Sequence, residues 1–198
     1  MSLSNYIPSS RLIQPGVCTS MTRPASPFEG QCIYETDTDM MAIWNGTAWR
    51  YITATTPTQG TVLQVVNATY STQLGSSSST PADTGLTATI TPKSSSSKIL
   101  VNVCQNGCYK NNLNAENRMG LRLLRDSTVL SNFSGGLFLY TGTAINMGAA
   151  ISTTYLDSPT TTSAVTYKTQ YWNPNNTNGV NVQTDSALSM ITLMELAG

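Results

Sequence analysis

The chain contains four cysteines, which stand as two pairs, Cys18 with Cys32 and Cys104 with Cys108. Cysteines in pairs could form disulfides or bind zinc. An even count permits disulfides, while Cys18 and Cys32 stand too far apart for a zinc knuckle. A turn at Asn106-Gly107 would bring Cys104 and Cys108 within disulfide range. If a strand continues there instead, their sulfurs lie roughly 13 Å apart and cannot bond. Buried free thiols are the alternative for both pairs.

The carboxylates offer no complete metal or catalytic site. Glu35, Asp37 and Asp39 alternate as in a calcium loop, but the glycine and later glutamate of that loop are absent, which predicts a solvated turn. The chain contains no histidine, which excludes a Ser-His-Asp triad, a Cys-His dyad and a histidine-bearing zinc site. We therefore expect no catalytic residue, no cofactor, no bound metal and no enzymatic activity.

Aromatic residues near the C-terminus could bind sugar rings. Tyr167, Tyr171 and Trp172 could together form a glycan platform, although such side chains more often pack on a sheet face. Trp44 and Trp49 flank Asn45-Gly46, a strong hairpin signal, and are expected to pair across two strands.

Composition narrows the class of protein further. Charged residues make up 10% of the 198 residues, with ten Lys+Arg against ten Asp+Glu, where soluble domains carry about 25%. This balance predicts no nucleic-acid partner, and no apolar run is long enough to predict a membrane span. The first ten residues lack the pattern of a signal peptide, yet the Ser/Thr/Asn-rich composition suits an extracellular setting. Both features together are typical of a virion protein released by lysis.

The first part of the chain predicts an arm and a small β-unit. Residues 1–27 hold four prolines without an apolar period, which predicts an extended arm that docks on a partner. The candidate docking residues of this arm are Tyr6, Ile7, Leu12, Ile13 and Val17. Residues 28–52 predict a three-stranded β-meander, too small to be stable alone, and residues 53–60 predict a linker.

Residues 61–198 predict an antiparallel β-sandwich of the jelly-roll type. Short β-branched apolar segments alternate with turn clusters, and signals for helices are almost absent. The expected strands are residues 61–69, 85–91, 98–104, 118–124, 128–133, 137–141, 144–154, 164–172 and 187–195. The fold class is therefore all-β. The expected core residues are Val62, Val65, Leu86, Ile90, Ile99, Val101, Val103, Leu121, Leu123, Ile151, Val165, Tyr167, Ile191 and Leu193.

Several of these segments resemble virion proteins of tailed bacteriophages, of the cyanophage and marine-phage type. Residues 23–52 match a module in which a Gly-Gln-x-Ile-Tyr-Glu-Thr-Asp-Thr strand precedes a Trp-Asn-Gly-x-x-Trp hairpin. Residues 86–101, 121–130, 153–170 and 189–198 resemble the trimeric jelly-roll heads of the complement-globular and tumour-necrosis-factor type.

This resemblance implies a non-enzymatic structural protein on the virion surface. It implies a homotrimer that serves as a capsid decoration or cement protein, or as a short head spike, with its arm on the major capsid protein. The alternative is a tail-fibre-like or spike-tip protein that binds a host surface receptor or glycan. In both cases the protein would be made in the host cytoplasm and exposed on the particle.

Overall fold

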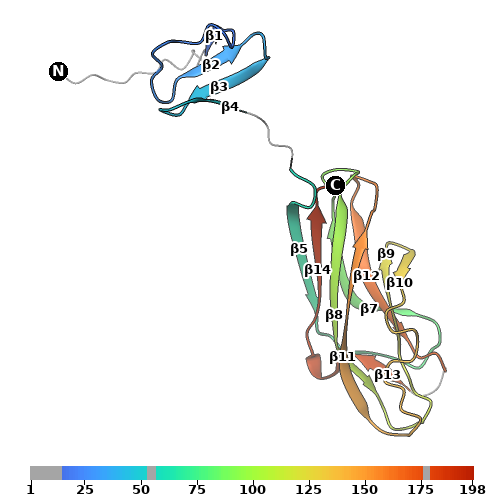
Figure 1. Ribbon diagram of the computed structural model, residues 1–198. Coiled ribbons are helices and arrows are strands. Elements are labelled where there is room, and N and C mark those ends of the chain that lie inside the picture. The colour runs from blue at the N-terminus through green and yellow to red at the C-terminus, as the bar shows by residue number, and fades with distance from the viewer. Residues whose placement is uncertain (1–14, 53–56, 176–178) are drawn as a thin grey trace. The chain divides into compact units, whose positions relative to one another are not determined.

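A computed structural model describes residues 15–52, 57–175 and 179–198 (Figure 1). The chain forms two compact units, Met1–Thr56 and Pro57–Gly198. The described residues form strands and a single 3-10 turn, η1 (Thr184–Ser186), without an α-helix. The expected all-β fold class is confirmed.

The first unit is one four-stranded sheet in the order β1-β2-β3-β4. Its strands are β1 (Gly16–Cys18), β2 (Cys32–Glu35), β3 (Met40–Trp44) and β4 (Trp49–Tyr51). The last three form the expected antiparallel meander. At its hairpin turn the Asn45 side-chain oxygen accepts hydrogen bonds from the backbone N–H groups of Thr47 and Ala48.

The sequence did not predict the fourth strand of this sheet: β1 lies within the expected arm of residues 1–27 and pairs parallel with β2. A meander alone would leave the outer edge of β2 without partners, and β1 supplies them. The chain after β1 is held too: the Ser20 N–H donates to Asp37 over 2.8 Å. Of the expected docking residues, Val17 lies in β1, while Tyr6, Ile7, Leu12 and Ile13 lie outside the described residues.

The second unit contains two antiparallel sheets, as a β-sandwich does (Figure 1). The small sheet has the order β10-β9-β12-β7, and the large sheet has the order β5-β14-β8-β13-β6 with β11 also paired to β8. The strands are β5 (Val62–Tyr70), β6 (Leu74–Ser76), β7 (Ala82–Ile90), β8 (Lys98–Lys110), β9 (Gly120–Arg125), β10 (Thr128–Ser131), β11 (Met147–Asp157), β12 (Val165–Trp172), β13 (Val180–Val182) and β14 (Ser189–Leu196). The jelly-roll connectivity stays a prediction.

Three details of this unit differ from the expected strands. Residues 137–141 form turns with a single bridge from Phe138 to Met119, and Leu139 has the positive φ of 66° that strands do not allow. The short strands β6 and β13 were not expected. The strand β8 continues through Asn106 and Gly107, where a φ of 61° at Gly107 shifts the alternation of side chains by one residue.

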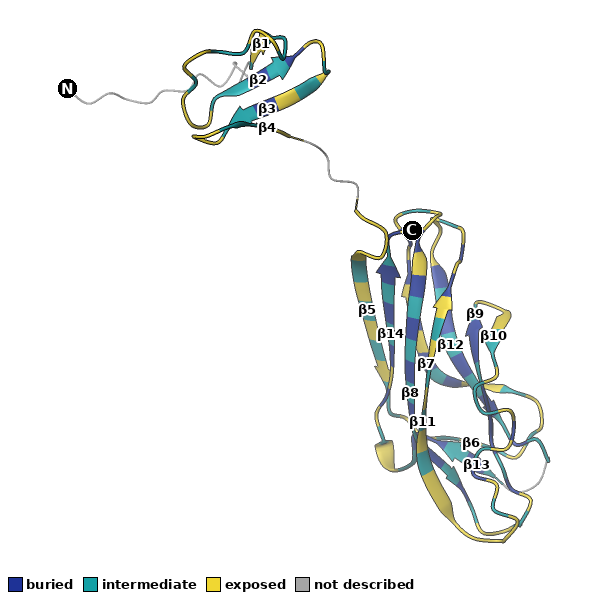
Figure 2. Ribbon diagram, viewed as in Figure 1, coloured by how far each residue is buried: buried dark blue, intermediate teal, exposed yellow. Residues whose placement is uncertain are grey.

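The core lies between the two sheets, where inward-facing residues of β7, β8, β12 and β14 are buried (Figure 2). It contains Leu86, Ile90, Ile99, Val101, Val103, Leu123, Val165, Tyr167, Ile191 and Leu193. A second cluster around Met119, Leu121, Tyr171 and Val182 fills the other end. Outward-facing residues of these strands alternate with the core residues and form the two outer faces of the unit.

Candidate functional site

The outer side of the large sheet is an extended surface that we call the open face. It is formed by the outward-pointing side chains of β5, β14, β8 and β11. Its residues are Val62, Val65, Asn67 and Thr69, then Met190, Thr192, Met194 and Leu196, then Lys98, Leu100, Asn102 and Cys104, then Ser152, Thr154 and Leu156. The shared register of these strands arranges most of these side chains in rows that cross the sheet.

Three rows define the chemistry of the open face. The apolar row runs through Val65, Met194, Leu100 and Leu156, which face one another across the four strands. The polar row beside it runs through Asn67, Thr192, Asn102 and Thr154. The sulfur row on the other side of the polar row runs through Thr69, Met190, Cys104 and Ser152.

The open face combines exposed apolar side chains with uncharged polar ones and is almost free of charge. Val65 is 56% exposed, Leu156 49% and Met190 41%. Lys98, at the end of β8, is the single charged residue among the open-face positions just named. A sheet face that meets water is normally polar, and contiguous apolar surface on a folded protein marks an interaction site.

The outer side of the small sheet has the opposite character. Lys168 forms an ion pair with Asp83 over 2.8 Å, and Gln170 donates to the same carboxylate over 2.6 Å. Arg122 then donates to Gln170 over 2.9 Å and lies over the Trp172 ring. This charged ladder spans β7, β12 and β9, as expected for a face that remains in water.

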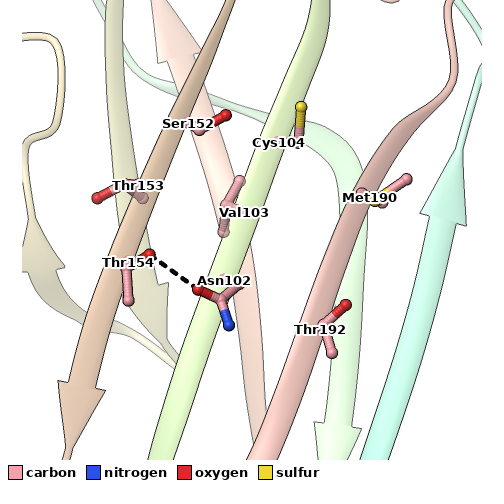
Figure 3. Close-up of a pocket in the computed structure, with 8 residues that line it drawn as sticks. All are labelled: Asn102, Val103, Cys104, Ser152, Thr153, Thr154, Met190 and Thr192. Atoms are coloured by element: carbon pink, nitrogen blue, oxygen red, sulfur yellow. Dashed lines mark hydrogen bonds between the residues drawn. The ribbon is translucent and has the colours of Figure 1, made fainter.

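A shallow hollow of about 220 Å³ lies in the open face, where β11, β8 and β14 meet (Figure 3). Its lining comes from Asn102, Val103, Cys104, Ser152, Thr153, Thr154, Met190 and Thr192. Within it the Thr154 hydroxyl donates to Asn102 Oδ1 over 2.8 Å. None of the lining residues is a carboxylate or a cationic side chain. The hollow therefore offers shape, hydroxyl and amide groups and two sulfur atoms, which suit contact with another surface.

All four cysteines are free thiols, so neither Cys18 with Cys32 nor Cys104 with Cys108 forms a disulfide. Cys104 points to the open face and Cys108 points inward, because the shift of alternation at Gly107 separates them. Burial raises the pKa of the Cys108 thiol to about 12. In the first unit Cys18 stands opposite Glu35 at the far end of β2 from Cys32, roughly 10 Å along the strand.

The expected glycan platform of Tyr167, Tyr171 and Trp172 was wrong as a set. Tyr167 and Tyr171 are buried in the sandwich, and the Tyr167 hydroxyl donates to Asp157 over 2.6 Å. Burial and this hydrogen bond raise the pKa of Tyr167. Only Trp172 points outward, where its indole lies over Gly120 so closely that a Cβ there would stand 2.1 Å from the ring.

The acidic turn of the first unit is a structural ion-pair site and only partly solvated. Glu35 has no exposed surface and binds Arg23 over 2.5 Å and the Tyr51 hydroxyl over 2.9 Å. The Arg23 hydrogen bond holds the pKa of Glu35 below its usual value. The described residues contain no group of three or more His, Cys, Asp or Glu that could hold a metal ion.

Sequence reasoning missed a group of polar side chains that we call the tip cluster: Glu116, Arg118, Tyr140 and Asn175. The Arg118 guanidinium lies 5.4 Å from the centre of the Tyr140 ring and donates to Asn175 over 3.0 Å. The Tyr140 hydroxyl donates to Glu116 over 3.3 Å. These residues come from three separate turns without regular structure, so no periodic signal could have joined them.

No protein-family model matches the chain, and a search of curated proteins also found no match. Among the described residues, the structure contains no helix with the length and hydrophobicity that crossing a membrane requires.

Proposed function

We propose that this protein is a non-enzymatic structural protein of a phage virion that assembles as a homotrimer through the open face. The observation that carries this proposal is the contrast between the two outer faces of one sandwich. The large sheet presents Val65, Leu156 and Met190 to the outside, whereas the small sheet presents ion-paired charges.

Self-association is the simplest way to cover such a face. A single sandwich buries only the inner side of each sheet, so the apolar row stays in water in an isolated chain. Removing apolar surface from water contributes roughly 25 cal/mol per Å². Closed cyclic symmetry covers this face on every copy and leaves no unpaired patch for further growth. The low content of charge, 10%, gives the uncovered face little protection against non-specific association.

The assignment to a phage particle and to a trimer rests on the resemblance described above. It draws on the Trp-Asn-Gly-x-x-Trp hairpin at residues 44–49 and on the head segments that resemble trimeric jelly rolls. The low-charge, Ser/Thr-rich composition supports a location on the particle surface. In this proposal the protein decorates or cements the capsid, or forms a short head spike.

The first unit supplies the anchor to other virion proteins, foremost the major capsid protein. Its apolar core is small, since Ile33 and Ala42 are its buried apolar residues in the range 15–52. Its surface is apolar instead: Met21 is 91% exposed, Phe28 70% and Val17 69%. A unit with so little core and so much exposed apolar surface is suited to docking on a larger partner.

The anchor is tested by replacing Met21 and Phe28 with Ser in the full chain. We expect the variant to keep its oligomeric mass and to lose incorporation into particles, measured by quantitative mass spectrometry of purified virions. Leu113→Ser is the matched control, because Leu113 is equally exposed at 68% but lies in the second unit. Full occupancy of the double variant on particles would contradict the anchoring role.

The tip cluster favours a second candidate function, a spike tip that binds a host surface glycan. Tyr140 is 43% exposed and is held by Arg118 and Glu116, so an aromatic ring stands beside donors and acceptors for sugar hydroxyls. Binding to host polysaccharide that Tyr140→Ala abolishes would support this function. Binding that survives Tyr140→Ala, or no binding at all, would contradict the glycan-binding function and leave capsid decoration as the only proposed function.

A further inference from the structure

The polar row lies between the apolar row and the sulfur row of the open face and has no role in the core. We propose that this row of Asn67, Thr192, Asn102 and Thr154 fixes the register, and with it the number, of the copies that meet through the open face. The inference rests on the proposed self-assembly and goes beyond it, because it assigns specificity to residues that add no apolar area.

The row is bonded internally at its two sides. The Thr154 hydroxyl donates to Asn102 Oδ1 over 2.8 Å, which joins β11 to β8. At the other side Asn67 Nδ2 donates to the Thr192 hydroxyl over 2.8 Å, which joins β5 to β14. Both bonds hold the amide groups in fixed orientations on the surface of the sheet.

Each amide also keeps one group for a partner outside the chain. Asn102 uses its oxygen for Thr154, and Figure 3 shows its Nδ2 turned away from that bond. Within the described part of the chain, the structure records no acceptor for this Nδ2 and no donor for Asn67 Oδ1. The face thus presents free donors on β8 and a free acceptor on β5.

These free groups make the open face complementary to a second copy of itself. A neighbouring copy offers the same donor and acceptor, so the amide of Asn102 can meet the amide of Asn67 across the interface. A partner that recognised this face by ion pairs would find only Lys98, at the end of β8. The occupant that fits the face best is therefore another chain of the same sequence.

Register follows from the cost of a mismatch. The smallest slip that keeps a side chain on the same face is two residues. Such a slip would place the amide of Asn102 against the apolar row or the sulfur row of the neighbour. An amide buried there without a partner costs about 1–3 kcal/mol, whereas the matched register satisfies it. A single buried asparagine specifies the partners of coiled coils by the same physics.

The test is native mass spectrometry of the full chain with Asn102→Leu. We expect a single trimeric species for the unmodified protein and at least two stoichiometries for the variant, with an unchanged or higher melting temperature. Thr89→Leu exchanges a polar for an apolar side chain on the outer side of the small sheet, so it is the matched control and should remain a single trimer. Asn67→Leu, on the edge strand β5, provides a second variant should Asn102→Leu fail to fold, with the same expected mixture.

Two results would overturn the inference, and they differ in what else they affect. Folded variants that remain a single trimer would show that the polar row does not set the register, and the proposed assembly would stand. An unmodified protein that is monomeric would remove the assembly and the register together.

Discussion

The two outer faces of the second unit are built alike and differ in charge. Both lie on antiparallel sheets and both are rich in Thr. Along the strands of both sheets, outward-facing residues alternate with residues of the shared core. The small sheet carries Asp83, Lys168 and Arg122 in one hydrogen-bonded ladder, whereas the large sheet carries the apolar row on its outer side. Alternation of side chains therefore separates inside from outside, and the distribution of the few charges separates an ion-paired outer face from a nearly uncharged one.

The largest expected effect tests the alternation of β8, whose successive side chains point to the core and to the open face in turn. Val101→Asp buries an unpaired charge, because Val101 has no exposed surface, and should destabilise the fold by at least about 3 kcal/mol. Leu100→Asp, one residue away on the open face, should leave the chain folded and dissociate the trimer. Chemical denaturation measures the first effect and light scattering the second. Equal losses of stability in both variants would contradict the division.

A matched pair of threonines compares the two faces directly. Thr154 on the large sheet and Thr89 on the small sheet are both exposed, and each makes a 2.8 Å hydrogen bond to a neighbouring strand. Thr154→Lys places a charge in the proposed interface and should weaken association about 100-fold or more. Thr89→Lys should leave it unchanged. Sedimentation equilibrium gives both constants, and similar behaviour of the two variants would erase the functional difference between the faces.

Acid separates folding from assembly. Burial pushes the pKa of Glu195 upward, but the nearby Ser97 and hydrogen bonds from Gln64 and from the Lys93 N–H outweigh it, and the pKa is lowered. A folded-state pKa below that of the unfolded chain means that this carboxylate stabilises the fold above about pH 4.5 and loses that contribution as the pH falls further.

The variant Glu195→Gln should therefore lower stability at pH 7 by about 1–2 kcal/mol and flatten its decline in acid, as followed by thermal melts across pH. The open face carries no carboxylate at its named positions, so the trimer should persist down to the pH at which the fold is lost. A variant with an unchanged pH profile would show that Glu195 is not the group responsible.

The smallest effect concerns the ladder itself. Asp83→Asn breaks the ion pair with Lys168. The Asp83 side chain is half exposed, at 51%. Exposed pairs of this kind contribute at most about 1 kcal/mol, and we expect less than about 0.5 kcal/mol in a denaturation curve. The oligomeric mass should not change. Loss of the trimer in this variant would show that the interface lies on the small sheet and contradict its assignment to the large sheet.

The inward positions were the most predictable part of the fold. Strict alternation identified Leu86, Ile90, Val101 and Leu193 as core residues, and all four are buried. The same reasoning placed Val62 and Val65 in the core, but they lie 50% and 56% exposed on the open face. Apolar side chains lie on both sides of β5, with Val62 and Val65 outward and Val66 and Ala68 against the core. A chain that buries its outer face against copies of itself would have the same pattern as a core strand.

The candidate site was less predictable because it depends on register and on local irregularities. Cys104 faces outward by regular alternation, and the bulge at Gly107 turns Cys108 inward; nothing in the Asn-Gly pair distinguishes a bulge from a turn. The row that joins Asn67, Asn102 and Thr154 comes from strands distant in the sequence, so only their pairing reveals it. Alternation alone could have separated Trp172 from Tyr171, since adjacent residues of a strand face opposite sides.

The most direct test of the account is the molar mass of the purified full-length chain, measured by light scattering coupled to size exclusion, beside the Leu100→Asp variant. We expect a monodisperse particle with three times the chain mass of 21.2 kDa for the unmodified protein, and a folded monomer for the variant. A monodisperse monomer of the unmodified protein, or a variant that remains a trimer, would contradict the claim that the open face is the assembly surface.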